Sequence, residues 1–263
     1  MLFSPTVNII TNDEGKRRIH PREIRHWIIP STVNRIEGDI FKSNIERITI
    51  QPSSQPLVIE TGAFYNCHNL RSFDFHSRPL IVKDYAFYYA GFVELIIPKT
   101  VRLDGKGIFM NNKQLLNLTI ENGRRIIPNK SFECCERLIN IRLPNDVVII
   151  EKSAFQNCFE LRDLICPDSL KRIGKNSFKN CGLRNFEAKN LQYIGKRAFI
   201  YCSFIKPKLD SIVKISKKAF HGTRVTNVMK TKTIYAIEEA AFDFDGEEDG
   251  LEDCHIAFVN SRR

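Results

Sequence analysis

The stretch from Leu138 to Cys158 reads LINIRLPNDVVIIEKSAFQNC, and variants of it recur along most of the chain. Its last part holds Phe155, which follows a small residue and precedes a cysteine by three positions. The phenylalanine returns every 21 to 23 residues, at Phe41, Phe64, Phe87, Phe109, Phe132, Phe155, Phe178, Phe199, Phe220 and Phe242. A fixed period of this length is the signature of a repeat architecture.

Two further features keep the same period. An aliphatic residue lies five positions before most of these phenylalanines, as Ile150 does before Phe155; only the Phe109 repeat shifts it, to Leu103. Three apolar residues spaced L-x-x-L-x-L come after each phenylalanine, as in Leu138, Ile141 and Leu143. The last two alternate with a polar residue, which is the period of a half-buried strand.

One short strand per repeat cannot bury its own apolar face, whereas stacked coils cover one another. We therefore predict a β-rich solenoid of about ten coils of 21–23 residues, with a parallel sheet on one face and about 4.8 Å between coils. Terminal repeats need polar caps. The predicted organisation is an N-terminal cap over 1–23, a single solenoid over 24–258 with an acidic insertion at 243–253, and a C-terminal tail over 259–263.

The repeat unit resembles the BspA-like leucine-rich repeat, also called the Treponema pallidum type. The resemblance covers about residues 24–258 and rests on several columns shared by nine or ten copies. It implies a right-handed leucine-rich-repeat solenoid with little helix, and a role in protein interaction or adhesion. No catalytic residues are known for this repeat, so the resemblance transfers none to this chain.

Composition and charge narrow the function further. The chain is 43% hydrophobic and 27% charged, as folded soluble proteins are, and its apolar runs are far shorter than a membrane span. The N-terminus lacks a basic segment followed by an apolar one, which favours a cytoplasmic protein, whereas the family resemblance favours the cell surface. Residues 238–253 hold nine of the 30 acids and no Lys or Arg, leaving 21 acids against 40 bases elsewhere.

The solvent-facing strand positions predict where a protein partner binds. Apolar residues at such positions mark interfaces when polar groups surround them. We expect an exposed apolar patch that contains Ile96 and Ile165 together with apolar residues of the neighbouring column of the strands. An equal alternative is that neighbouring loops cover these residues. The candidate protein-binding residues are Val93, Ile96, Leu116, Asn117, Ile139, Asn140, Arg142 and Ile165.

A second surface is basic. Several Lys and Arg residues occupy equivalent loops of successive repeats, and stacking would align them in a stripe along one edge. Such a stripe suits a phosphate backbone or an acidic protein surface, although no aromatic residues are interleaved for base stacking. Nucleic acid is therefore the minor alternative to a protein partner. The candidate polyanion-binding residues are Lys171, Arg172, Lys175, Lys196, Arg197 and Lys217.

The remaining motifs favour neither an enzyme nor a metalloprotein. Five of the eight cysteines lie three residues after a phenylalanine, as Cys135, Cys158, Cys181 and Cys202 do, and reduced buried thiols are favoured over disulfides between stacked coils. No paired C-x-x-C, phosphate loop or nucleophile elbow occurs, and the acidic stretch 243–249 lacks the ligand order of a calcium loop. We expect a non-enzymatic binding scaffold without cofactor or metal.

Overall fold

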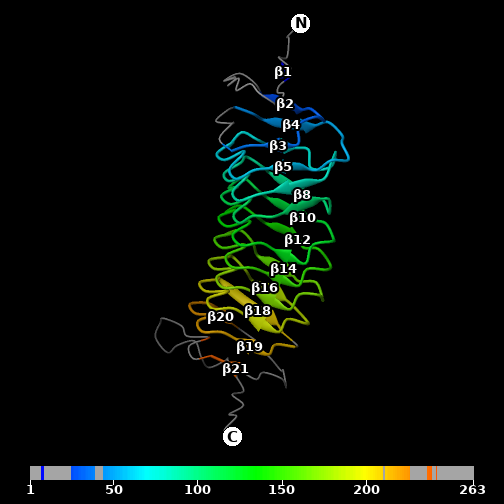
Figure 1. The fold of residues 1–263 in the computed structure, drawn as a ribbon. Coiled ribbons are helices and arrows are strands. Elements are labelled where there is room, and N and C mark those ends of the chain that lie inside the picture. Colours follow the sequence, from blue (N-terminus) through cyan, green and yellow to red (C-terminus); the bar gives the residue numbers. More distant parts are fainter. Residues whose placement is uncertain are drawn as a thin grey trace.

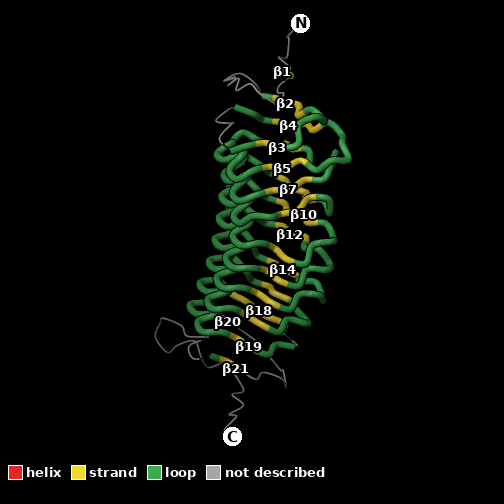
Figure 2. The backbone as a smooth tube through the Cα atoms, in the orientation of Figure 1, coloured by secondary structure: helices red, strands yellow, loops and turns green. Residues whose placement is uncertain are grey.

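A computed structural model of the chain describes residues 7–8, 25–38, 44–209, 211–225, 236–238 and 241. The chain winds into an elongated solenoid, with β2 (His26–Ile29) near one end and β21 (Ala236–Ile237) near the other (Figure 1). Short strands alternate with longer turns, and there is no helix among the described residues (Figure 2). Eight consecutive coils each contribute one phenylalanine to the core, from Phe64 to Phe220, and described strands of further coils lie on either side of them.

One set of strands is formed by the L-x-x-L-x-L segments, as predicted. Neighbouring strands pair in parallel within three successive sheets of order β1-β2-β4-β6, β8-β10-β12 and β14-β16-β18-β20. Strand β1 is not one of these segments and lies in the predicted N-terminal cap. We call the outward side of these strands the first face. Besides β2 its strands are β1 (Val7–Asn8), β4 (Arg47–Ile50), β6 (Ser72–Phe73), β8 (Glu94–Ile97), β10 (Asn117–Ile120), β12 (Asn140–Arg142), β14 (Asp163–Ile165), β16 (Asn185–Glu187), β18 (Phe204–Lys208) and β20 (Arg224–Val225).

A second set of strands forms around the aliphatic column, where we had predicted only inward packing. These strands are also parallel, in sheets of order β3-β5-β7-β9 and β11-β13-β15-β17-β19-β21. Their outward side is the second face. Besides β21 they are β3 (Arg35–Ile36), β5 (Leu57–Ile59), β7 (Leu80–Val82), β9 (Val101–Leu103), β11 (Ile126–Ile127), β13 (Ile149–Ile150), β15 (Arg172–Ile173), β17 (Tyr193–Ile194) and β19 (Lys214–Ile215).

The core is organised around a ladder of phenylalanine rings. Each ring from Phe64 to Phe220 stacks on the ring of the next coil, with centroids 5.1 to 5.6 Å apart and planes within 10° of parallel. All eight side chains are fully buried. The ladder confirms the repeat that the sequence predicted; Phe41 and Phe242 lie outside the described residues.

The turn that carries the phenylalanine explains its flanking residues. The backbone is left-handed two positions before and two positions after the ring, as at Ser153 (φ 54°) and Asn157 (φ 62°) around Phe155. Asparagine and glycine adopt this conformation most readily, and asparagine recurs after the ring at Asn66, Asn111 and Asn180. Ala154, the small residue before the ring, is fully buried.

The coil of Phe109 interrupts the second face. Leu103 still pairs with Val82 of the preceding coil, but the shift seen in the sequence places one extra residue between Leu103 and Phe109. Strand β9 therefore does not pair with β11, and the second face divides into two sheets there.

Candidate functional site

The first face presents alternating residues to solvent. On β8, Leu95 and Ile97 are buried, whereas Glu94 and Ile96 are exposed. The strand register places Thr119 beside Ile96, and Arg142 beside Thr119. The outward residues of successive coils therefore form continuous columns along the solenoid.

One of these columns is a hydrogen-bonded ladder of amides. The Asn140 Nδ2 donates to Asn117 Oδ1 at 2.8 Å, and the Asn117 Nδ2 donates to Glu94 Oε1 at 3.1 Å. Two coils further along, the Asn185 Nδ2 donates to Asp163 Oδ1. These contacts fix the side-chain positions, so the polar part of the first face is ordered before any partner arrives.

The expected apolar patch is divided into two parts. Ile96 is 50% and Ile139 46% exposed, while Val93 and Leu116, on the same three coils, are partly buried. Ile165 is 78% exposed and belongs to the same column as Ile96. The two coils between these isoleucines place Thr119 and Arg142 in that column, so the two apolar residues are not in contact through it.

Phe159 is a candidate that the sequence analysis missed. Its ring is 51% exposed and lies in the same coil as Ile165, six residues before it. The corresponding residues of other coils are polar or glycine, including His68, Lys113, Glu136 and Gly182. The sequence contained a signal for this residue: Phe159 is large and apolar at a position where the other coils have small or polar residues.

The basic stripe is brought together largely as predicted. The same position of consecutive coils is occupied by Lys175, Lys196 and Lys217. Hydrogen bonds between neighbouring turns show this register. The carbonyl of each lysine accepts from the backbone N–H that lies one residue after the equivalent position of the preceding coil. Lys152, which the sequence analysis omitted, precedes them in this column. All four side chains are exposed.

The other members of the stripe surround this column. Arg172 lies outward on β15, with its guanidinium 4.5 Å from the ring centroid of Tyr193 on β17. The Arg197 side chain is exposed, and its backbone is in the left-handed conformation with φ at 57°. Lys171 lies just before β15 and is partly buried. Tyr193 thus interleaves with the basic residues, contrary to the expectation that no aromatic residue does so.

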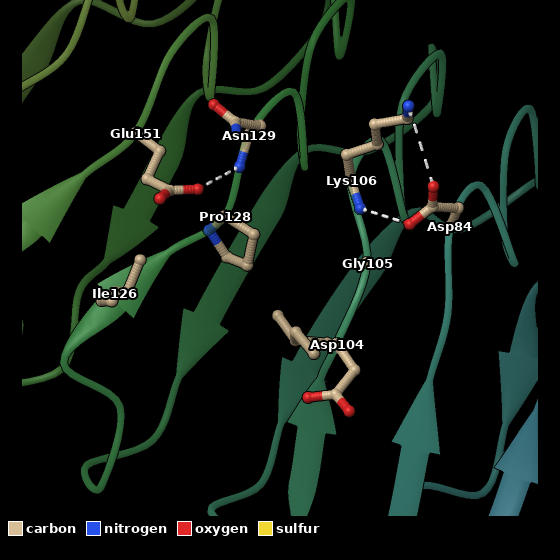
Figure 3. A pocket seen from close by; sticks show the side chains of 9 residues that line it. Asp84, Asp104, Gly105, Lys106, Ile126, Pro128, Asn129 and Glu151 are labelled. Atoms are coloured by element: carbon tan, nitrogen blue, oxygen red, sulfur yellow. Dashed lines mark hydrogen bonds and ion pairs between the residues drawn. The ribbon is translucent and has the colours of Figure 1, made fainter.

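A shallow pocket of about 350 Å³ lies where β9 and β11 fail to pair (Figure 3). Its carboxylates already have partners. Asp84 accepts from the Lys106 backbone N–H at 3.0 Å, and Glu151 accepts from the Asn129 backbone N–H at 2.9 Å (Figure 3). Asp104 contacts Arg102 and Lys83, and the hydrogen bond from Arg102 contributes most to lowering the pKa of this carboxyl.

Asp84 and Asp104 are ion-paired, and Glu151 is hydrogen-bonded to a backbone N–H of the neighbouring turn. Among the residues that the structure describes, no three His, Cys, Asp or Glu side chains are placed to hold a metal ion. The same part of the chain contains no helix long and apolar enough to cross a membrane.

The described cysteines are free and serve the packing of coils. The thiols of Cys135, Cys158, Cys181 and Cys202 each donate to the carbonyl of the phenylalanine in the preceding coil, at 3.1 to 3.5 Å. Burial raises the pKa of the Cys135, Cys158 and Cys202 thiols, and it raises the pKa of Cys67 to about 12. Cys254 lies outside the described residues.

The stacked parallel coils, the inward L-x-x-L-x-L residues and the phenylalanine ladder define a leucine-rich-repeat solenoid. The chain belongs to the family of BspA type leucine rich repeat regions, whose profile matches residues 20–88, 34–158, 80–206 and 125–246. No curated protein matches the chain.

Solved structures of bacterial proteins resemble it at low sequence identity. A leucine-rich repeat protein from Bacteroides ovatus gives a TM-score of 0.64 at 22% identity, over 85% of this chain and 66% of that one. The Treponema pallidum leucine rich repeat protein gives 0.47 at 20% identity, over 64% and 89%. A leucine rich cell surface protein from Faecalibacterium prausnitzii gives 0.44 at 19% identity, over 84% and 70%. The first likeness supports the fold alone, and this chain spans just under two thirds of that protein.

Proposed function

We propose that this protein is a non-enzymatic scaffold that binds a protein partner through the first face. The observation that carries the proposal is the exposure of Ile96 and Ile139 beside the ordered amide ladder. Apolar side chains rimmed by fixed polar groups are the usual composition of a protein interface.

The surroundings of this patch fit the same role. Glu94, Asn117 and Asn140 supply donors and acceptors in a row along the three coils that also carry Val93, Leu116 and Ile139. Ile165 and Phe159 extend the apolar surface in the coil after Arg142. A partner that spans these four coils would contact both parts, and Arg142 lies between them. Adhesion at a cell surface is the form of this function that the family implies.

Photo-crosslinking from chosen positions tests the proposal. A benzophenone amino acid replaces Ile139 on the first face or Ile126 on the second face, since these isoleucines are 46% and 44% exposed and so are a matched pair. We expect a discrete crosslinked species in native cells from position 139 and none from position 126. Crosslinks of equal yield from both positions, or from position 126 alone, would contradict the use of the first face.

A further inference from the structure

The turn that follows β10 contains a pair of residues that favours a chemical change. Asn122 is followed by Gly123, the single Asn-Gly pair in the sequence, and both residues are exposed. The backbone nitrogen after an asparagine can attack the side-chain Cγ and close a five-membered succinimide, and glycine hinders this attack least because it has no side chain. Gly123 has φ at 99°, and a Cβ built on it would contact only the Lys99 Cβ, at 3.5 Å, apart from its chain neighbours. The turn is therefore open around Gly123.

The N–H group of Gly123 is held by a carboxylate. It donates to both oxygens of Asp146 in the next coil, at 3.0 and 2.9 Å. An amide nitrogen becomes a nucleophile only when its proton is removed, so the closure of a succinimide needs a base at this hydrogen. A general base must lie within hydrogen-bond reach of the proton that it takes, about 2.6–3.2 Å between heavy atoms. The carboxylate of Asp146 meets this condition.

The side-chain carbonyl of Asn122 is held by a donor from the same neighbouring turn. Its Oδ1 accepts from the Asn145 backbone N–H at 2.8 Å. Attack on the Asn122 Cγ places negative charge on this oxygen, and a donor about 2.7–3.1 Å from a developing oxyanion stabilises that charge. Asn145 and Asp146 are consecutive, so one turn presents both the donor and the base to the Asn-Gly pair of the coil before.

We propose that Asn122 is a self-catalysed deamidation site. Asp146 takes the proton of the Gly123 amide, the Gly123 nitrogen forms a bond to the Asn122 Cγ, and the bond from this carbon to Nδ2 breaks. The leaving nitrogen takes the proton back from Asp146 and departs as ammonia. Water then opens the succinimide at one of its two carbonyls, which leaves isoaspartate or aspartate at position 122. Water is the only co-reactant, and the exposure of both residues gives it access.

The equivalent turns of the next coils provide an internal comparison. Asn145 takes the place of Asn122 one coil later, but it is followed by Asp146, whose side chain hinders attack by the backbone nitrogen. One coil further the position is occupied by Asp168, which has no amide to lose. Deamidation is therefore confined to the turn between β10 and β11. It adds a negative charge to this turn, and isoaspartate also lengthens the backbone between the two strands.

Peptide mapping tests the proposal on the unaltered protein. The protein is kept at neutral pH and physiological temperature, either folded in buffer or unfolded in guanidinium chloride, and is sampled over days for digestion and mass spectrometry. Because the folded turn supplies both a base and a donor, we expect Asn122 to deamidate at least about tenfold faster in the folded protein than in the unfolded chain. Asn145 should stay unmodified in the folded protein over the same period. A folded rate equal to or below the unfolded rate would overturn the proposal, because the turn would then give no assistance.

A pair of variants tests the base itself. Asp146→Asn should slow the deamidation of Asn122 in the folded protein about tenfold or more and leave the rate in guanidinium chloride unchanged, because the unfolded chain does not use Asp146. Glu121→Gln is the matched control, since Glu121 is an exposed carboxylate beside Asn122 that accepts from the Lys99 backbone N–H of the preceding coil. It should change the folded rate less than about twofold. Thermal melting checks that each variant folds, and a folded Asp146→Asn protein that deamidates as fast as the unaltered one would overturn the role of Asp146.

Discussion

At the scale of single residues, the position three after the phenylalanine bonds most of the coils together. Cysteine thiols at Cys158 and Cys181 donate to a phenylalanine carbonyl of the preceding coil, and Asn112 and Thr223 make the equivalent contact with an amide and a hydroxyl. What these side chains share is a small volume and a hydrogen-bond donor. The sequence identified the column but attributed it to packing alone, because the acceptor lies a whole coil away in the chain.

Substitutions at Cys158 separate the donor from the volume. Cys158→Ala removes the thiol that bonds to the Phe132 carbonyl and leaves a small cavity, so we expect it to lower the free energy of unfolding by about 1–2 kcal/mol. Cys158→Thr keeps a donor and should cost less, as the same column already contains Thr223. Urea unfolding measures both. A threonine variant less stable than the alanine variant would contradict this role of the donor.

Thiol chemistry offers a second test at this scale. Burial raises the pKa of Cys67 to about 12, so only a trace of thiolate is present at pH 8. Cys134 is partly exposed. Mass spectrometry after brief iodoacetamide treatment should find Cys134 alkylated in the native protein and Cys67 alkylated only in urea. Equal native labelling of the two cysteines would show that the coils open readily.

At the scale of elements, the coil is the unit that the sequence predicts well. The period of the phenylalanines and the L-x-x-L-x-L segments determined the stacked coils and the strands of the first face. The strands of the second face were not predicted, since a two-residue strand such as β15 is too short to show alternation. The shift at Leu103 was visible in the sequence, but the break between β9 and β11 that accompanies it required the structure.

The candidate sites were predictable in part, for a similar reason. Stacking alone aligned Lys175, Lys196 and Lys217, because equivalent positions of successive coils must superpose. The carboxylate contacts of Glu151 and Glu238 depend on how one turn meets the next, which the repeat pattern does not encode. The separation of Ile96 from Ile165 was likewise predictable, because counting coils along the sequence gives two coils between them. Those two coils carry Thr119 and Arg142 in the same column.

Two phenylalanines of one coil provide a matched test of the ring ladder. Phe155 is fully buried between Phe132 and Phe178, whereas Phe159 is 51% exposed. We expect Phe155→Ala to lower the free energy of unfolding by about 3–5 kcal/mol, because the cavity interrupts the stack. Phe159→Ala should cost less than about 1 kcal/mol. Chemical unfolding followed by circular dichroism measures both, and comparable losses would contradict the assignment of the core.

At the scale of the whole molecule, the solenoid separates two surfaces along its length. The amide ladder and the exposed isoleucines occupy the first face of the central coils, from Glu94 to Ile165. The column of exposed lysines occupies a different edge of the coils, from Lys152 to Lys217. Because each coil contacts only its neighbours, substitutions on one surface should leave the other unaffected.

The most direct test of the central claim measures how tightly the variant Ile96→Asp/Ile139→Asp binds the partner captured from position 139, with Ile126→Asp as the control of equal exposure. The proposed interface predicts a loss of affinity of at least about 2 kcal/mol in the double variant, because two carboxylates would be desolvated in an apolar contact, and no loss in the control. A folded double variant that binds as tightly as the unaltered protein would show that the partner does not use the first face.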